Sequence, residues 1–233
     1  MTASSTPHRV DGRAARWAGQ HERRRREFVD AALRAIAEHG PEVSTEQIAE
    51  QAGVARTRLY KHFTDTPDLQ AAISERTVEL ITAELLPALD PQRTPVQMVR
   101  GVISAHIGWL VEHDNLFRYL TRYAVSSRSG GRDAFTDTKS AIAGHLTLMF
   151  EHYLGAFGMD TRVAEMSAFG VVGLVESSTS RWVEHPGGMD REELADLLTG
   201  WVWRLIDDVL RSGGVELDPH EPLAAQELSA RGG

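Results

Sequence analysis

Apolar residues recur every three or four positions along most of this chain, the spacing that places them on one face of an α-helix. The first such segment is predicted to run from residue 22 to 39 and to end at Gly40-Pro41. Its apolar face holds Phe28, Ala32, Ala35 and Ile36. No segment shows the strict alternation of a half-buried strand. The chain is therefore predicted to be all-α.

Further helices are expected along the rest of the chain, at residues 44–53, 55–63, 67–85, 95–113, 116–125, 133–157, 161–184 and 190–210. Two of their starts carry a capping signature, Ser44 followed by Gln47 and Asp190 followed by Glu193. The segment at 126–132, SSRSGGR, is predicted to be an interior loop. The two ends, 1–20 and 213–233, lack periodicity and are predicted to be flexible tails.

Charge is unevenly distributed along the sequence. Residues 1–63 hold ten arginines and one lysine against eight acidic residues, a net charge of +3. The remaining residues carry a net charge of −11. A mildly basic amino-terminal part on an acidic body is the asymmetry expected when one end meets an anionic partner.

Several classes of protein are excluded or disfavoured by composition. The chain has no cysteine, so it has no disulfide, thiolate metal site or cysteine nucleophile. Its longest nearly apolar stretch, residues 168–175, is far shorter than a membrane span of about 20 residues. Residues 1–20 lack the apolar core of a secretory signal. We expect a cytoplasmic protein with no membrane partner.

The segment Ser44–Phe63 has the spacing of a helix-turn-helix. Two short helices that cross need a small residue at the crossing and a turn residue that tolerates positive φ, which Ala49 and Gly53 supply. Apolar anchors toward the core are Ile48, Ala52, Val54 and Leu59. The second helix then exposes a dense set of hydrogen-bond donors on an element that fits the DNA major groove.

The candidate DNA-binding residues are Thr45, Arg56, Thr57, Arg58, Tyr60, Lys61 and His62. Arginine pairs with a guanine edge through two hydrogen bonds, whereas Thr45, Tyr60 and Lys61 suit phosphate oxygens. The run Arg23–Arg26 has two readings, additional phosphate contacts or the solvated start of a helix. The motif itself has an alternative reading as scaffold, in a helical adaptor that dimerises without binding DNA.

Residues 22–70 resemble the tetracycline-repressor (TetR-like) family of bacterial transcriptional regulators. The matching positions are Ile48-Ala49, Ala52-Gly53-Val54, Leu59-Tyr60, His62-Phe63 and Leu69. Three positions depart from the family pattern, with Ala55 replacing a Ser cap, Thr57 a Gly and Thr66 a Lys. The resemblance implies a DNA-binding domain at 21–65 and a larger helical domain at 66–212 for ligand binding and dimerisation.

The same resemblance implies a homodimeric repressor that binds a palindromic double-stranded DNA operator and is released by a small-molecule effector. The predicted dimer interface comprises Gly170, Gly173, Ser177, Leu194, Leu198, Trp201 and Leu205, although these residues would equally fill a monomeric core. Polar and aromatic residues of the middle helices are candidates for an effector pocket: His106, Trp109, His113, Tyr119, Tyr123 and His145.

A competing interpretation is a metal-dependent hydrolase built on histidines. His106 and His113 lie seven residues apart, as do His145 and His152, so that a four-histidine cluster is conceivable. The sequence lacks HExxH, GxSxG and GxGxxG motifs and any phosphate-cradling loop. We therefore expect no enzyme activity, no metal site and no cofactor.

Overall fold

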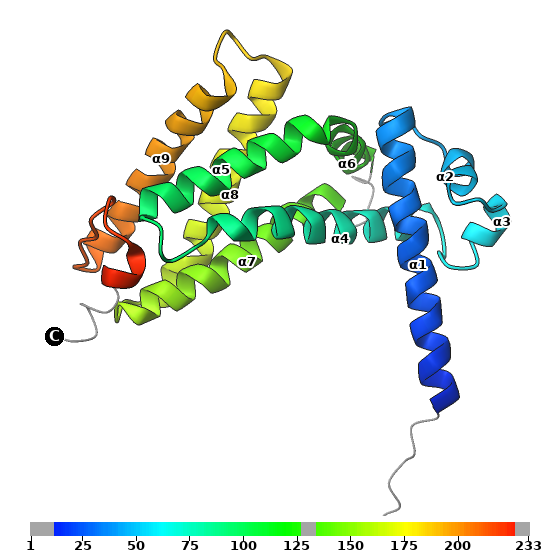
Figure 1. Cartoon of the computed structure of the whole chain (residues 1–233), viewed down its shortest axis with the longest axis horizontal. Coiled ribbons are helices and arrows are strands. Elements are labelled where there is room, and N and C mark those ends of the chain that lie inside the picture. The colour runs from blue at the N-terminus through cyan, green and yellow to red at the C-terminus, as the bar shows by residue number, and fades with distance from the viewer. Residues whose placement is uncertain (1–11, 127–133, 227–233) are drawn as a thin grey trace, which may run out of the picture. The chain divides into compact units, whose positions relative to one another are not determined.

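A computed structural model of the protein describes residues 12–126 and 134–226, without the side chains of residues 12–18, 123–126 and 134–138. Within these ranges the chain is all-helical, as the sequence predicts (Figure 1). It divides into two compact units, Met1–Ile73 and Ser74–Gly233. The two units meet between Ile73 and Ser74, inside a helix, whereas the sequence analysis placed the domain boundary after residue 65.

The first unit comprises α1 (Gly12–His39), α2 (Thr45–Gln51), α3 (Arg56–Leu59) and the start of α4 (Thr66–Leu85). Helix α1 begins at Gly12, so the prediction of a flexible tail through residue 20 is wrong for residues 12–20. The segment is rich in Ala and Arg, which are strong helix formers, and its single interior Gly19 lowers helix stability by only about 1 kcal/mol.

The two short helices follow from local sequence chemistry. The Ser44 hydroxyl accepts a hydrogen bond from the Gln47 backbone N–H (3.2 Å), and the Gln47 side chain accepts one from the Ser44 N–H (2.8 Å). This confirms the predicted capping box. Gly53 adopts φ +67° in the turn, the conformation for which glycine was expected. Helix α3 starts at Arg56, after the N-cap residue Ala55, which provides no side-chain cap, and it ends at Leu59, four residues earlier than predicted.

The second unit contains the remainder of α4 and the helices that follow it: η1 (Leu86–Ala88), α5 (Pro95–Glu112), α6 (Asp114–Ser126), α7 (Ala134–Ala156), η2 (Thr161–Val163), α8 (Ala164–Glu184) and α9 (Arg191–Ser212). Helix α5 packs along α9, and α7 packs along α8 (Figure 1). The predicted capping at Asp190 is confirmed, because its carboxylate accepts from the Glu193 N–H at 2.9 Å. Apart from Ser126, the predicted loop at 126–132 lies outside the described residues.

The segment after α9 is folded onto the second unit as far as residue 226, which corrects the prediction of a flexible tail from residue 213. The Leu223 N–H donates to the Arg93 carbonyl at 3.2 Å, and the Val96 N–H donates to the Pro219 carbonyl at 3.4 Å. Leu217 and Leu223 are buried in a core cluster with Met98, Leu154 and Leu210. The segment is thus attached both by backbone hydrogen bonds and by two buried apolar side chains.

Of the helices in the described part of the chain, none combines the length and the apolar character needed to cross a membrane.

Truncation of Leu223 tests whether the carboxy-terminal segment contributes to stability. Leu223→Ala should lower the free energy of unfolding by about 2 kcal/mol, because a buried leucine loses its core contacts. Glu221→Ala, at an exposed position of the same segment, should change stability by less than about 0.5 kcal/mol. Urea unfolding followed by circular dichroism measures both. Equal values for the two variants would show that the segment does not depend on Leu223.

Candidate nucleic-acid interface and ligand cavity

Helix α3 presents a short polar face held in place by one apolar anchor. Leu59 is fully buried, whereas Arg56, Thr57 and Arg58 are exposed, as is Lys61 in the following turn. Four of the seven predicted DNA-binding residues therefore lie together on one exposed segment. Two arginines and a lysine within six residues form a dense cationic group suited to DNA.

The Arg56 side chain contacts two neighbouring residues of its own unit. Its Nη1 lies 2.5 Å from Oε1 of Glu46 on α2, and its guanidinium lies 5.5 Å from the centre of the Tyr60 ring. Both charged side chains are more than half exposed, and exposed pairs of this kind contribute little to stability. A DNA phosphate or base can therefore replace Glu46 as the partner of Arg56 at small energetic cost.

Two further predicted residues already hold hydrogen bonds within the unit. The Tyr60 hydroxyl lies 3.0 Å from the Thr66 hydroxyl. Thr66 is the position where the TetR-like pattern has a lysine, and here it orients Tyr60 at the start of α4. Thr45 is the first residue of α2, and its hydroxyl donates to Glu46 at 3.3 Å.

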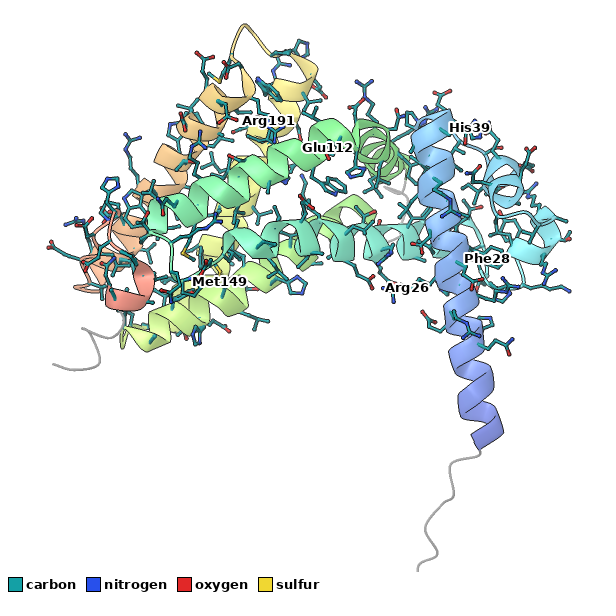
Figure 2. All side chains as sticks on the ribbon, viewed as in Figure 1. Arg26, Phe28, His39, Glu112, Met149 and Arg191 are labelled. Carbon is teal, nitrogen blue, oxygen red and sulfur yellow. The ribbon has the colours of Figure 1, made fainter. Side chains whose placement is uncertain are left out.

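His62 is half-buried against α1 and is not exposed as Arg56, Arg58 and Lys61 are, which corrects its predicted place among the exposed donors. Its ring lies 4.7 Å from that of His21 and 5.1 Å from that of Phe28, both on α1. Phe28 is labelled on α1 in Figure 2. The Nδ1 atom of His62 is buried without a hydrogen-bond partner in the described structure. Because α3 ends at Leu59, the residues after it no longer continue the exposed face of a helix.

The arginine run Arg23–Arg26, predicted at the start of a helix, lies within α1, and its described members differ in their contacts. Arg25 is half-buried and donates from Nη1 to the His62 carbonyl at 2.8 Å. Its Nη2 lies 2.5 Å from Oδ1 of Asp68 on α4, and its guanidinium stacks 4.4 Å from the centre of the Phe63 ring. Arg24 is exposed and paired with Glu27. Arg25 is therefore a structural residue rather than a phosphate contact.

Asp68 is the acceptor at the centre of this arrangement. Its Oδ2 also accepts the Thr64 N–H at 2.8 Å. The hydrogen bonds from Arg25, followed by that from Thr64, hold the pKa of Asp68 below its ordinary value despite partial burial. The pKa of His62 is also lowered, first by burial and then by nearby His21 and arginines. For a histidine this shift favours the neutral ring.

The second unit encloses a cavity of about 660 Å³. It is lined by α4, η1, α5, α7, α8, α9 and the carboxy-terminal segment, and Met149, labelled in Figure 2, is one of its α7 side chains. Most lining residues are apolar, and a cavity of this size falls in the range of small-molecule sites. Among the described lining residues, Leu86 and His145 are exposed.

The predicted ligand residues are only partly at this cavity. His106 and His145 line it, whereas Trp109 and Tyr119 are buried elsewhere and His113 is exposed. The side chain of Tyr123 is outside the described residues. No three His, Asp or Glu side chains gather to hold a metal ion in the described ranges. The correction has a simple cause, since residue type alone does not tell which face of a helix points inward.

Two charged residues at the cavity were missed by the sequence analysis. Lys139 Nζ on α7 lies 2.5 Å from Glu176 Oε2 on α8, and both side chains line the cavity. A signal was present, because Lys139 continues the stripe of Ile142, Leu146 and Met149 on the inward side of α7. A charge on an apolar stripe marks a position with a partner or a ligand.

The predicted dimer-interface residues also divide into two groups. Leu194 and Leu198 are buried in the core of their own unit, and Leu205 lines the cavity. Gly170, Gly173, Ser177 and Trp201 are exposed on α8 and α9, which pack together. Large exposed apolar side chains accompany them at Met166, Phe169 and Leu197. The prediction of Leu194, Leu198 and Leu205 as interface residues therefore conflicts with their placement.

Comparison with known proteins agrees with this architecture. A sequence model described as "Bacterial regulatory proteins, tetR family" matches residues 28–73. An uncharacterized HTH-type transcriptional regulator of Mycobacterium tuberculosis is 30% identical over 207 residues, which cover 88% of this chain and 87% of the relative. The chain belongs to the TetR family. As a TetR-family member it is a helix-turn-helix transcriptional regulator, and this confirms the resemblance seen in the sequence.

More distant proteins are similar to this TetR-family regulator in sequence or in fold. The transcriptional activator FasR of Mycolicibacterium smegmatis is 23% identical over 188 residues, covering 77% of this chain and 81% of FasR. A TetR-family regulator from Streptomyces coelicolor superimposes with a TM-score of 0.64 at 19% identity, covering 91% and 89% of the two chains. FadR of Bacillus subtilis, solved with stearoyl-CoA, gives 0.55 at 22% identity over 76% and 96%.

Loss of the Asp68 charge tests the role of Arg25. Asp68→Asn should lower the free energy of unfolding at neutral pH by about 1–3 kcal/mol, because the half-buried guanidinium loses its counter-charge. The depressed pKa of Asp68 stabilises the fold above the unfolded pKa of about 3.9, and this contribution is lost as pH falls through the folded value. The Asn variant should lack that pH dependence.

The matched control is Glu27→Gln, which removes the exposed partner of Arg24 on the same helix. This change should alter stability by no more than about 1 kcal/mol. Urea unfolding between pH 3 and pH 7 measures both variants, the range following from the unfolded carboxyl pKa of about 3.9. If the two variants behaved alike, Arg25 would have no special structural role.

Proposed function

We propose that this regulator is a homodimeric repressor that binds a palindromic DNA operator in the cytoplasm and is released by a small-molecule effector. The observation that carries the proposal is the exposed group Arg56, Thr57, Arg58 and Lys61 on a helix-turn-helix anchored by Leu59. Arg56 and Arg58 are assigned to base edges, while Lys61 and Thr45 are assigned to phosphates. Tyr60, whose hydroxyl is hydrogen-bonded to that of Thr66, is likewise assigned to a phosphate.

Dimerisation is supported by the exposed apolar surface of α8 and α9. Met166 and Phe169 are 67% and 43% exposed, and Trp201 is 41% exposed. Aromatic side chains and methionine are enriched in the buried centre of protein interfaces. Gly170 and Gly173 lie on the same helix as Phe169 and would allow a partner helix to approach closely. A two-fold dimer formed this way would present two α3 helices to a palindrome.

The effector is assigned to the 660 Å³ cavity of the second unit. Helix α4 carries Thr82 and Leu85 at this cavity and Asp68 at its other end, so one element takes part in both the effector site and the Arg25 cluster. FadR, a structural relative, binds stearoyl-CoA, which supports a small-molecule role for the corresponding unit here. A release of about 100-fold requires about 2.7 kcal/mol of difference between the two states.

Arg58 is the sharpest test of DNA binding because its side chain is exposed on α3, next to the buried anchor Leu59. Arg58→Ala should weaken operator binding by about 1–3 kcal/mol and relax the base preference at one position of each half-site. Operator sequences selected from random duplexes at two salt concentrations supply the probe.

The control for this experiment is Arg162→Ala, which removes an equal charge from an exposed position in the second unit. It should leave operator affinity and the salt slope unchanged. If neither wild type nor Arg162→Ala selected a motif, the chain would be an adaptor that dimerises without reading DNA.

A bulky charge at Gly173 tests the dimer. A Cβ at this position meets no atom within 4 Å in the protomer, so Gly173→Arg should fold normally. In the dimer the arginine would separate the two subunits and weaken association by about 2 kcal/mol or more. Gly155→Arg on α7, where a Cβ is equally unobstructed, should leave the dimer intact. Sedimentation equilibrium measures both, and a dimeric Gly173→Arg variant would place the interface elsewhere.

A further inference from the structure

The cavity is elongated rather than round. Its α7 wall runs from Lys139 to Phe157 in one continuous stripe of inward positions. At 1.5 Å of rise per residue, this stripe is about 27 Å long. Lining residues of α5 are likewise spread along the helix, from Pro95 to His106. A molecule that fills the cavity must therefore be long and narrow.

The two ends of the cavity differ in chemistry. Toward Phe157 the wall is the apolar cluster that includes Leu154, Leu210, Leu217 and Leu223. At the Lys139 end of α7 the wall contains charged groups, because Glu176 of α8 meets Lys139 there. Isolated polar groups such as Ser167 line other parts of the wall. This gradient orients an amphipathic molecule with its polar group toward Glu176.

The charges at the polar end already neutralise each other. Glu176 Oε2 pairs with Lys139 Nζ at 2.5 Å, and its Oε1 accepts the Ser180 hydroxyl at 3.0 Å. The Glu176 side chain is only 13% exposed. A ligand carboxylate would bring a negative charge against Glu176, and a ligand ammonium would bring a positive charge against Lys139. Either charge would be taken from water without a free counter-charge.

His106 adds a hydrogen-bond acceptor to this end. Its Nε2 lies 3.3 Å from the Thr179 hydroxyl, whose own proton is directed to the Val175 carbonyl at 2.9 Å. Thr179 therefore accepts from His106, and the ring carries its proton on Nε2. Burial lowers the pKa of His106 to about 4, so the ring is neutral at pH 7 and Nδ1 has a lone pair available.

We propose that the effector is an elongated, uncharged aliphatic molecule whose polar end carries a hydroxyl or amide hydrogen-bond donor. The aliphatic body occupies the length of the α7 stripe, and the donor is received by His106 beside the Lys139–Glu176 pair. This inference rests on the proposed effector role of the cavity and adds its chemical class. Glu176 and Lys139 are specificity-determining residues, because while they pair with each other neither serves as counter-charge to a charged head group.

Displacement of the uncharged fluorescent probe N-phenyl-1-naphthylamine from the full-length dimer measures this preference without DNA. The competitors share one chain and differ at the head: 1-tetradecanol below its solubility limit, and tetradecanoate and tetradecyltrimethylammonium below their micelle concentrations. Wild type should bind tetradecanol at least about tenfold more tightly than either ion. It should also prefer tetradecanol to 1-methoxytetradecane by about tenfold, because the ether has no donor.

Charge variants provide a second, independent readout. Glu176→Gln leaves Lys139 without its counter-charge and should shift the preference toward tetradecanoate by at least about tenfold. Lys139→Gln leaves Glu176 and should shift it toward tetradecyltrimethylammonium by a similar factor. Glu165→Gln, at an exposed position of α8, is the control and should keep the wild-type order.

Three outcomes would overturn the inference. These are a wild-type preference for either ion, an ether that binds as well as the alcohol, and charge variants that keep the wild-type order. If no competitor displaced the probe while the protein still selected an operator, the ligand class would be rejected and DNA binding would stand. If the competitors bound as expected but no operator were found, the cavity chemistry would hold and the repressor role would fail.

Discussion

The DNA-facing part of this protein depends on one guanidinium. Helices of seven and four residues are too short to be stable alone, so α2 and α3 require fixed attachments at their ends. Arg25 of α1 provides one by binding the His62 carbonyl after α3 and the Asp68 carboxylate in α4, while it stacks on Phe63. Together with the Tyr60–Thr66 and Thr64–Asp68 hydrogen bonds, this side chain holds the turn between α3 and α4, which places the exposed face of α3.

Features that depend on neighbours in sequence were predictable. The Ser44–Gln47 and Asp190–Glu193 boxes, the positive φ of Gly53 and the burial of Leu59 follow from chemistry within a few residues. The ends of the chain were not, because attachment there depends on distant partners. Leu223 is held by the Arg93 carbonyl and by a core formed from α5, α7 and α9, none of which its local sequence reveals.

The candidate site shows the same division. The exposure of Arg56 and Arg58 was predictable from the anchor Leu59, whereas the packing of His62 and the bonding of Arg25 to the α3–α4 turn were not. Both changes depend on the early end of α3, which brings the His62 ring and carbonyl against α1. At the cavity, histidine and aromatic content was a poor guide. The pairing of Lys139 with Glu176 depends on the packing of α7 on α8, which residue type alone does not fix.

The two units use packing differently, and α4 belongs to both. In the first, Ile36, Leu59, Phe63 and Leu69 are almost completely buried, so small displacements meet close contacts. In the second, an apolar cavity is retained although filling it would add stability. A ligand that fills it gains contacts with Thr82 and Leu85, about 20 Å along the same helix from Asp68. Alternative side-chain arrangements differ least in energy at the cavity end of α4, because packing is loose there. The Asp68 end is closely packed, so it would respond to the ligand as one rigid part.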